Sequence, residues 1–283
     1  MNKLLTVLVC ALFAANASGQ SEQVLRPVLS AYTFEAGTAH AADTYLSPLH
    51  YSGWHAGVGY ERMQAMAFNP DDWIMQLGLR GIVDRMANPA RNAHMWNFEV
   101  DGRWCMMRRF RDVFTPGLTL AIGPGTELRG GALWLSRNGN NPASAKGAWT
   151  VDLAVMGSYN IHIGKLPVTF RYECALPVAG VFFAPEYGEL YYELWLGNHS
   201  GVVHTAWWGD YFRIDNYVTA DLRFGGTTLR VGYRNDVTST KSDDVVSRRI
   251  THTFTLGVAT EWLSLSARKN TLDRDARIIS ALY

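Results

Sequence analysis

Cysteine and net charge are both scarce in this sequence. Only three cysteines occur among 283 residues. Cys105 and Cys174, the two beyond the N-terminal stretch, fall on opposite faces of alternating segments, so we expect two free thiols rather than a disulfide framework. The formal net charge of +1 gives no indication of nucleic-acid binding. Phosphate loops, paired-cysteine motifs and nucleotide fingerprints are also absent from the sequence, which predicts no cofactor.

Histidines and paired acids do not form a metal-binding pattern either. His55, His162 and His252 are isolated on predicted strands and lack the spacing of metal ligands. Asp71-Asp72 and Asp243-Asp244 carry the oxygen ligands that calcium prefers, but we interpret both pairs as solvated loop acids. The sequence therefore predicts no bound metal.

The N-terminus has the pattern of a secretory signal peptide. Lys3 is followed by a short apolar run over residues 4–15 and then by small residues that end at Gly19. The run is too short for a membrane helix. We expect cleavage after Gly19, which divides the chain into a signal peptide, 1–19, and a mature domain, 20–283. The mature part has about 260 residues and no Pro/Ser-rich linker or charge block, which favours a single domain.

Apolar and polar residues alternate with a period of two along the mature chain, and no segment of helical length shows a 3.6-residue period. From Trp149 to Ile163 the odd positions are apolar apart from one glycine, while the even positions include Thr150, Asp152 and His162. Similar segments predict strands near residues 26–38, 50–66, 72–86, 93–110, 116–136, 148–164, 166–182, 210–225, 227–240 and 249–265. A further hairpin within 183–209 would raise the number from ten to twelve.

The length of these strands separates a membrane barrel from a soluble sandwich. They exceed the mean strand of about five or six residues and reach the roughly 9–11 residues needed to cross a bilayer. Tight turns at Gly164-Lys165 and Gly225-Gly226 alternate with longer polar loops at 84–93, 137–147 and 236–248, as in outer-membrane barrels. We predict an all-β fold: a transmembrane, antiparallel, up-and-down β-barrel of ten to twelve strands.

The charged face of the strands is expected to line the lumen. A charge on the lipid face costs about 2–4 kcal/mol at the bilayer midplane, and a charge inside a narrow barrel needs a partner. We therefore predict a lumen filled by ion pairs rather than a ring-shaped selectivity filter. The predicted network comprises Glu61, Arg80, Glu99, Asp101, Arg103, Asp152, Arg171, Glu173, Asp221, Arg223, Arg230, Arg234 and Glu261.

Four longer stretches carry a resemblance to a family. They are ERMQAM (61–66), SRNGNNPASAKGAWTV (136–151), GELYYELWLGNHSG (188–201) and VTADLRFG (218–225). Together they resemble an uncharacterised family of Bacteroidota outer-membrane proteins, known as a domain of unknown function. The resemblance covers most of the mature chain; it implies an outer-membrane barrel and brings no established activity.

A second, fainter resemblance is to outer-membrane phospholipases and lipid A deacylases. It rests on Ser136-Arg137-Asn138-Gly139 and on the later Trp149-Thr150. Those enzymes carry a His-x-Ser at a strand end, then Asn-Gly, and the phospholipases a later Trp-Asn. Here Trp134 stands in place of the general-base histidine, and Thr150 in place of the orienting asparagine. A serine without a base is a poor nucleophile at neutral pH, so the main reason to assign Ser136 a catalytic role is lost.

His199 and Ser200, with His204 and Asp210 nearby, supply the atoms of a Ser-His-Asp set. Adjacent His and Ser rarely meet in productive geometry, and we interpret this segment as an extracellular loop whose polar groups cap one another. No catalytic residue is assigned; His199, Ser200, Asp210 and Ser136 remain candidates for a lipid hydrolase.

The sequence favours a non-enzymatic outer-membrane protein with a structural or surface-interaction role. It would be exported in a Gram-negative cell by its cleaved signal peptide and would have outer-membrane lipids as partners. No protein partner is indicated. Two alternatives stay open: an outer-membrane lipid hydrolase of the phospholipase or deacylase type, and a narrow diffusion channel.

Overall fold

Ten long strands form the body of the computed structural model, which describes residues 24–139, 141–185, 191, 196–197, 201–263 and 276–283. The strands are β2 (Val28–Asp43), β3 (Ser47–Ala65), β4 (Trp73–Ala87), β5 (His94–Phe110), β6 (Leu118–Leu135), β7 (Ala143–Ile163), β8 (Leu166–Phe183), β10 (Tyr211–Phe224), β11 (Thr227–Ser242) and β12 (Val245–Trp262). Among the described residues no helix is long and apolar enough to cross a membrane. The predicted signal peptide, 1–19, lies outside the described residues.

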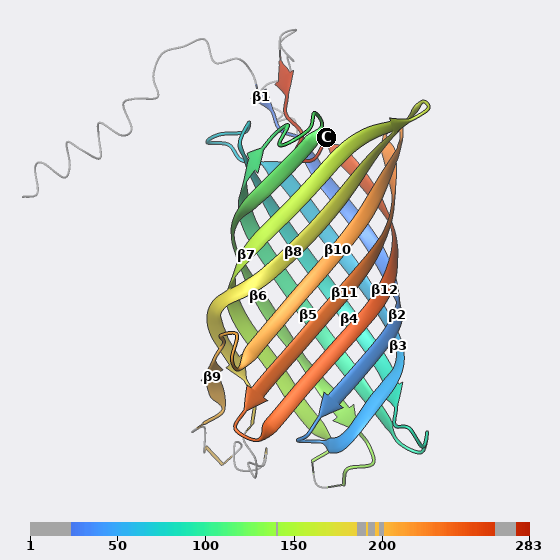
Figure 1. The fold of residues 1–283 in the computed structure, drawn as a ribbon, viewed down its shortest axis with the longest axis vertical. Helices are drawn as coiled ribbons and strands as arrows, with labels where there is room; N and C mark the ends of the chain where they lie inside the picture. Colours follow the sequence, from blue (N-terminus) through green and yellow to red (C-terminus); the bar gives the residue numbers. More distant parts are fainter. Residues whose placement is uncertain (1–23, 140, 186–190, 192–195, 198–200, 264–275) are drawn as a thin grey trace, which may run out of the picture.

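Each long strand pairs in antiparallel fashion with its neighbours, and the sheet closes on itself (Figure 1). Consecutive strands are adjacent from β2 to β8, β8 pairs with β10, and β12 returns to pair with β2. Closure leaves no row of unpaired backbone N–H and C=O groups facing outward. The predicted all-β antiparallel barrel is confirmed, with ten strands in its described wall.

The structure decides the alternative left open for 183–209 and corrects one predicted loop. The segment 183–209 adds no hairpin to the wall, because its described part contributes only β9 (Val203–Thr205), which pairs with the end of β8. The predicted loop 236–248 is mostly strand: β11 and β12 are joined at Asp243-Asp244. This segment looked like a loop because it is polar, but its threonines and valines are β-branched residues that favour strands.

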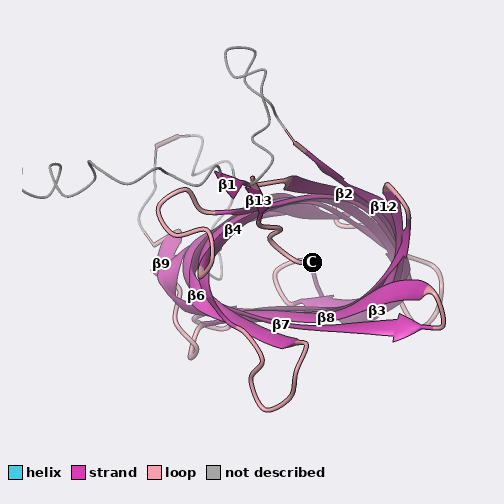
Figure 2. Ribbon diagram, turned by 90° about the horizontal axis from the view of Figure 1, so that it is seen from above, coloured by secondary structure: helices cyan, strands magenta, loops and turns pink. Residues whose placement is uncertain are grey.

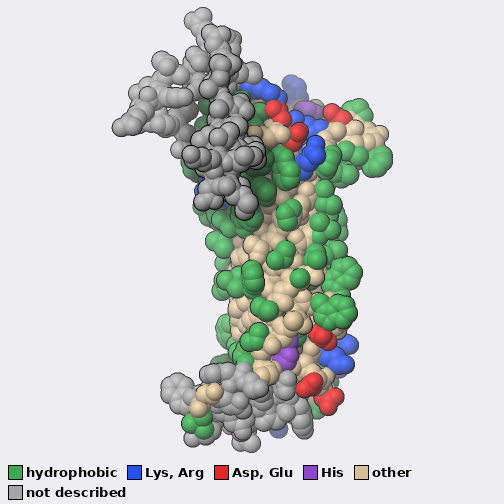
Figure 3. Space-filling model, turned by 90° about the vertical axis from the view of Figure 1, so that its left-hand side faces the viewer, with side chains coloured by type: hydrophobic (Ala, Val, Ile, Leu, Met, Phe, Trp, Pro, Cys, Tyr) green, Lys and Arg blue, Asp and Glu red, His purple; other side chains and the backbone are tan. Residues whose placement is uncertain are grey.

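The outer surface of the barrel wall is apolar. In β7, Trp149, Val151 and Leu153 are 52%, 43% and 40% exposed, whereas Asp152, between the last two, is 4% exposed. Figure 3 shows hydrophobic side chains over the middle of one wall and charged side chains towards its two ends. The alternation seen in the sequence therefore sorts apolar residues to the outside and polar residues to the lumen, as a lipid-embedded barrel requires.

The chain enters and leaves the barrel at one end, which we call the terminal end; the opposite end, with the 184–210 connection, is the loop end (Figure 1). At the terminal end β1 (Val24–Leu25) pairs in parallel with β13 (Arg277–Ile278). Residues 279–283 then turn into the lumen, where the view along the barrel shows them inside the ring of strands (Figure 2). These residues add no strand to the wall.

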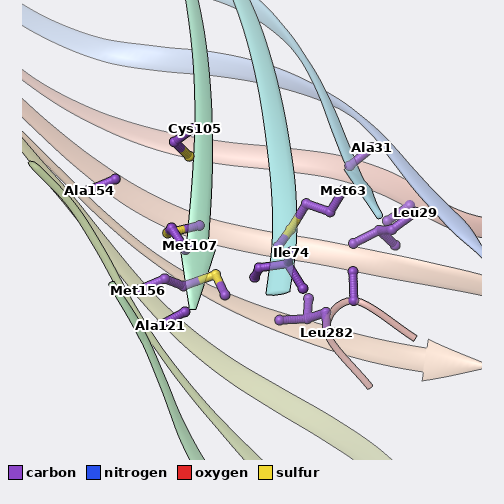
Figure 4. Close-up of a cluster of buried hydrophobic side chains, with 12 residues drawn as sticks. Leu29, Ala31, Met63, Ile74, Cys105, Met107, Ala121, Ala154, Met156 and Leu282 are labelled. Carbon is purple, nitrogen blue, oxygen red and sulfur yellow. The ribbon is translucent and has the colours of Figure 1, made fainter. Parts of the chain in front are cut away.

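Buried apolar clusters lie towards both ends of the lumen. At the terminal end Leu282 of the inserted tail packs with Leu29, Met63 and Ile74 (Figure 4). Towards the loop end a second cluster includes Tyr51, Met86, Met95 and Leu133. The charged side chains occupy the strand positions between the two clusters. The cysteines are free as predicted: Cys105 is buried in the first cluster, and Cys174 is partly exposed.

The apolar outer row of β7 yields a test of its lipid contact. In lipid vesicles, Leu153→Lys is expected to lower the free energy of unfolding by about 2–4 kcal/mol, because it places a charge near the middle of the hydrocarbon. Ile163→Lys, the matched change beside the Gly164-Lys165 turn, is expected to cost about 0–1 kcal/mol. Equal effects of the two variants in urea titrations would contradict this placement.

Candidate functional site: the charged lumen

The strand period of two brings the charged residues of the lumen together. Every second side chain of each strand points inward, and the closed wall aims the inward positions of all ten strands at one interior. Arg171 and Arg230 are 2% and 0% exposed, and Asp221 is 0% exposed. The site is therefore a desolvated charge network, in which a missing partner is costly.

The part of the network nearest the terminal end is built around Glu61. Its carboxylate accepts hydrogen bonds from Arg171 at 2.7 and 3.0 Å and from Arg230 at 3.1 Å. Arg230 also donates to both oxygens of Asp221 at 2.7 and 2.8 Å. The two residues are direct cross-strand partners on β10 and β11, so the register of the sheet itself produces this bidentate pair.

Arginines at mid-height bridge carboxylates from several strands. Arg103 reaches Asp215 at 2.8 Å and Glu127 at 3.1 Å. Arg213 donates to Glu127 and, at 2.7 Å, to Asp236. Each guanidinium presents five N–H donors, which lets one side chain satisfy acceptors on two or three strands.

A histidine belongs to the part of the network nearer the loop end. His55 Nδ1 lies 2.6 Å from Asp84 Oδ1, and its Nε2 lies 3.7 Å from Glu35. Asp84 accepts further hydrogen bonds from Asn97 at 2.8 Å and Arg249 at 3.2 Å. The interpretation of His55 as an isolated strand histidine is wrong: its neighbours come from β2 and β4, far from it in sequence.

The structure places all thirteen predicted network residues on the lumen side, with different partners. Arg80 lies 3.5 Å from Asp101, and Glu99 pairs with Arg129 at 2.5 Å. Glu173 pairs with Arg171, and Arg234 pairs with Glu35. Three predicted members lie outside the ion pairs found among the described residues: Asp152, Arg223 and Glu261. Asp152 is buried, Arg223 stacks on Tyr283, and Glu261 accepts a hydrogen bond from Ser280 at 2.5 Å.

Several charged residues of the network were missed by the sequence prediction. They are Glu35, His55, Asp84, Glu127, Arg129, Arg213, Asp215, Asp236 and Arg249. All have the inward parity of their strands, which is the signal that could have found them. Asp84 and Asp236 were missed because each begins a segment predicted as a loop.

Residues 280–283 close the network at the terminal end. Arg109 donates to the carbonyl oxygens of Ser280 at 2.7 Å and Ala281 at 3.1 Å. The Tyr283 hydroxyl donates to Asp221 Oδ2 at 3.1 Å, and the Arg223 guanidinium lies 4.4 Å from the Tyr283 ring centre. Burial raises the pKa of this phenol above its usual value, which keeps the donor proton in place.

A space of about 190 Å³ lies beside Leu282 and Tyr283 at the terminal end, but the spaces between the charged side chains at mid-height are smaller. One cavity of about 60 Å³ lies near Glu99, Arg129 and Arg249, and another of about 50 Å³ lies near Glu61 and Arg103. Each has room for a few water molecules at most. Charged side chains thus fill the lumen between its apolar ends.

The candidate catalytic residues do not come together in the described part of the chain. Ser136 is exposed at the start of the β6–β7 turn, and the Asp210 carboxylate accepts a hydrogen bond from the Trp207 indole at 3.1 Å. His199 and Ser200 lie outside the described residues. No group of His, Cys, Asp and Glu among the described residues is arranged to hold a metal.

One Ser–His contact does occur, between Ser242 and His204. The Ser242 hydroxyl lies 2.9 Å from His204 Nε2, and the same nitrogen lies 3.0 Å from the carbonyl oxygen of Ala184. A carbonyl only accepts, so Nε2 must carry the proton and cannot take another from serine. This contact fixes β9 to the wall and does not activate a nucleophile.

Solved structures with a similar fold are outer-membrane barrels. The translocator domain of autotransporter NalP from Neisseria meningitidis has 11% identity and a TM-score of 0.41, with 92% of this chain and 95% of that chain covered. The outer membrane protease OmpT from Escherichia coli has 10% identity and a TM-score of 0.45, with 87% and 99% covered. The COG4313 outer membrane channel from Pseudomonas putida F1 has 9% identity and a TM-score of 0.35, with 87% and 100% covered.

Two further comparisons concern the sequence. Residues 4–269 match the family described as "Protein of unknown function (DUF3316)". No curated protein matches the chain.

The Arg230–Asp221 pair yields a test of the network. Arg230→Met is expected to lower the free energy of unfolding by about 3–5 kcal/mol, because it leaves Asp221 buried without its guanidinium. Arg230→Met combined with Asp221→Asn should recover part of this loss. Arg248→Met, an exposed arginine on β12, should change stability by no more than about 0.5 kcal/mol. Urea titration in micelles measures all three; an effect of Arg230→Met as small as that of the control would contradict the pairing.

Proposed function

The chain belongs to the family described as "Protein of unknown function (DUF3316)", and from this premise we propose that it is a non-conducting barrel of the outer membrane with a structural or surface-interaction role. In this proposal the signal peptide is cleaved after Gly19, the terminal end faces the periplasm, and the loop end faces outward. Outer-membrane lipids surround the apolar wall.

The filled lumen is the observation that supports this proposal over the diffusion channel. A channel needs a continuous polar path with loosely held charges. Here the arginines are fixed by carboxylates: Arg230 holds both oxygens of Asp221, and Arg213 joins Glu127 to Asp236. The Leu282 cluster at one end and the Tyr51 cluster at the other add apolar layers across the path.

Ordered connections at the loop end support a surface-interaction role. The Asn88 side-chain oxygen accepts hydrogen bonds from the backbone N–H groups of Asn92 and Ala93 at 3.0 and 3.2 Å. Asn138 reaches the carbonyl oxygen of Leu46 on a neighbouring connection at 3.3 Å, and Arg137 reaches that of Asn92 at 3.0 Å. These bonds join three connections around an open depression of about 520 Å³, a preformed surface for a partner.

Planar-bilayer recording of the purified full chain tests the proposal. We expect no steady conductance steps in low or high salt, because an ion entering the lumen would have to displace paired charges and cross two apolar layers. An open porin recorded in the same bilayers is the positive control. A reproducible ohmic step from this chain under the same conditions would overturn the proposal.

A further inference from the structure

Two tryptophans flank one outward-facing arginine near the loop end. Arg85 on β4 lies directly opposite Trp54 on β3 and Trp96 on β5, and Trp134 on β6 continues the same row. The Trp54 and Trp96 rings meet edge to face at 6.0 Å between centres. The Arg85 guanidinium lies 5.8 Å from the centre of the Trp96 ring.

This row lies at the edge of the apolar wall. Arg85 is the third residue from the end of β4, and the outward positions before it are Trp73, Met75, Leu77, Leu79, Gly81 and Val83. An arginine on a barrel surface costs about 2–4 kcal/mol at the bilayer midplane but about 0–1 kcal/mol near the interface. Tryptophan is enriched at the same depth. Arg85 therefore marks the level of the lipid headgroups.

The guanidinium of Arg85 has hydrogen-bonding capacity to spare. It makes a cation–π contact with the Trp96 ring. Within the described ranges no carboxylate or carbonyl oxygen accepts a hydrogen bond from it. The acidic residues of strands β2 to β6 all have lumen-facing parity. The outer surface around Arg85 thus presents a cation with five N–H donors and no carboxylate of its own strands to compete for them.

Small and apolar neighbours complete the site. On the same strand, the next outward residue is Ala87 towards the loop end and Val83 towards the middle of the apolar wall. Val83 has Ala56 and Phe98 as its partners on the two neighbouring strands. The guanidinium is therefore framed by two indoles, with a small residue towards the headgroup layer and an apolar strip leading into the hydrocarbon. An acyl chain fits the strip, and a phosphate fits the planar donor fork.

We propose that Arg85, framed by Trp54 and Trp96, binds the phosphate of an anionic lipid in the outer leaflet. The inference rests on the proposed outward orientation of the loop end. The phosphate accepts two hydrogen bonds from the guanidinium, the indoles exclude water from the contact, and the acyl chains lie along Val83 and Phe98. The contact would hold one lipid at a fixed position on the β3–β6 wall.

Arg108 offers a matched control within the same chain. It faces outward near the opposite end of β5, and its guanidinium lies 5.4 Å from the Phe110 ring centre. It thus shares the cation–π contact of Arg85 but has no pair of flanking tryptophans, and it lies at the level of the other leaflet.

Titration of the full chain in nonionic micelles with bisphosphorylated lipid A, followed by tryptophan fluorescence and native mass spectrometry, tests the proposal. Arg85→Gln should weaken binding by about tenfold or more, because charge-assisted bidentate bonds to phosphate are lost. Arg85→Lys should retain part of the affinity, and Arg108→Gln should change it by less than about twofold. Lipid A without phosphates should bind the native chain as weakly as the intact lipid binds Arg85→Gln.

Three results would overturn the proposal: equal affinity of Arg85→Gln and the native chain, equal binding of phosphate-free lipid A, or inorganic phosphate binding as tightly as the lipid. Heat-modifiable migration on gels confirms that each variant is folded. Because this assay measures lipid affinity in micelles, its failure is distinct from that of the non-conducting barrel, which the bilayer recording tests separately.

Discussion

A charge removed from water in the lumen is costly without a partner of opposite sign, and this constraint governs the rest of the structure. An unpaired buried charge costs several kcal/mol. The Arg230–Asp221 pair exists because β10 and β11 meet in one particular register. If β11 slipped by one residue, Arg230 would turn towards lipid and Asp221 would lose its partner, so the charges help to specify the register together with the apolar wall.

Arginine suits this role because one guanidinium can join several strands. Arg80 on β4 lies 3.4 Å from Glu35 on β2, 3.5 Å from Asp101 on β5 and 3.4 Å from Asp236 on β11. The contacts with Glu35 and Asp236 join β4 to strands with which it shares no backbone hydrogen bonds. They brace the wall from inside, while the apolar clusters at both ends keep water from screening the pairs. The result is a closed barrel with a filled lumen, in which the groups free to contact other molecules lie on the outer surface.

The alternation of apolar and polar residues with a period of two was enough to predict the barrel, most strand positions and the inward direction of the charged side chains. It could not predict which charges meet. Glu35 reaches Arg234 on β11, a strand that does not pair with β2, so this contact depends on closure of the wall. His55 lies between Glu35 and Asp84, contacts that depend on the register of β2, β3 and β4. Asp84 and Asp236 were missed although they lie inside the predicted strands 72–86 and 227–240, because the predicted polar loops 84–93 and 236–248 begin at the same residues. Insertion of Leu282 and Tyr283 into the lumen follows from tertiary packing and from no local pattern in the sequence.

Salt dependence of stability tests the central claim that the lumen charges are paired and shielded from solvent. Pairs exposed to water are screened strongly between about 0.1 M and about 1 M sodium chloride, whereas buried pairs are screened much less. The free energy of unfolding of the native chain in nonionic micelles is therefore expected to stay constant over this range. A pronounced loss of stability at high salt would show that water and ions occupy the lumen, and it would contradict the account.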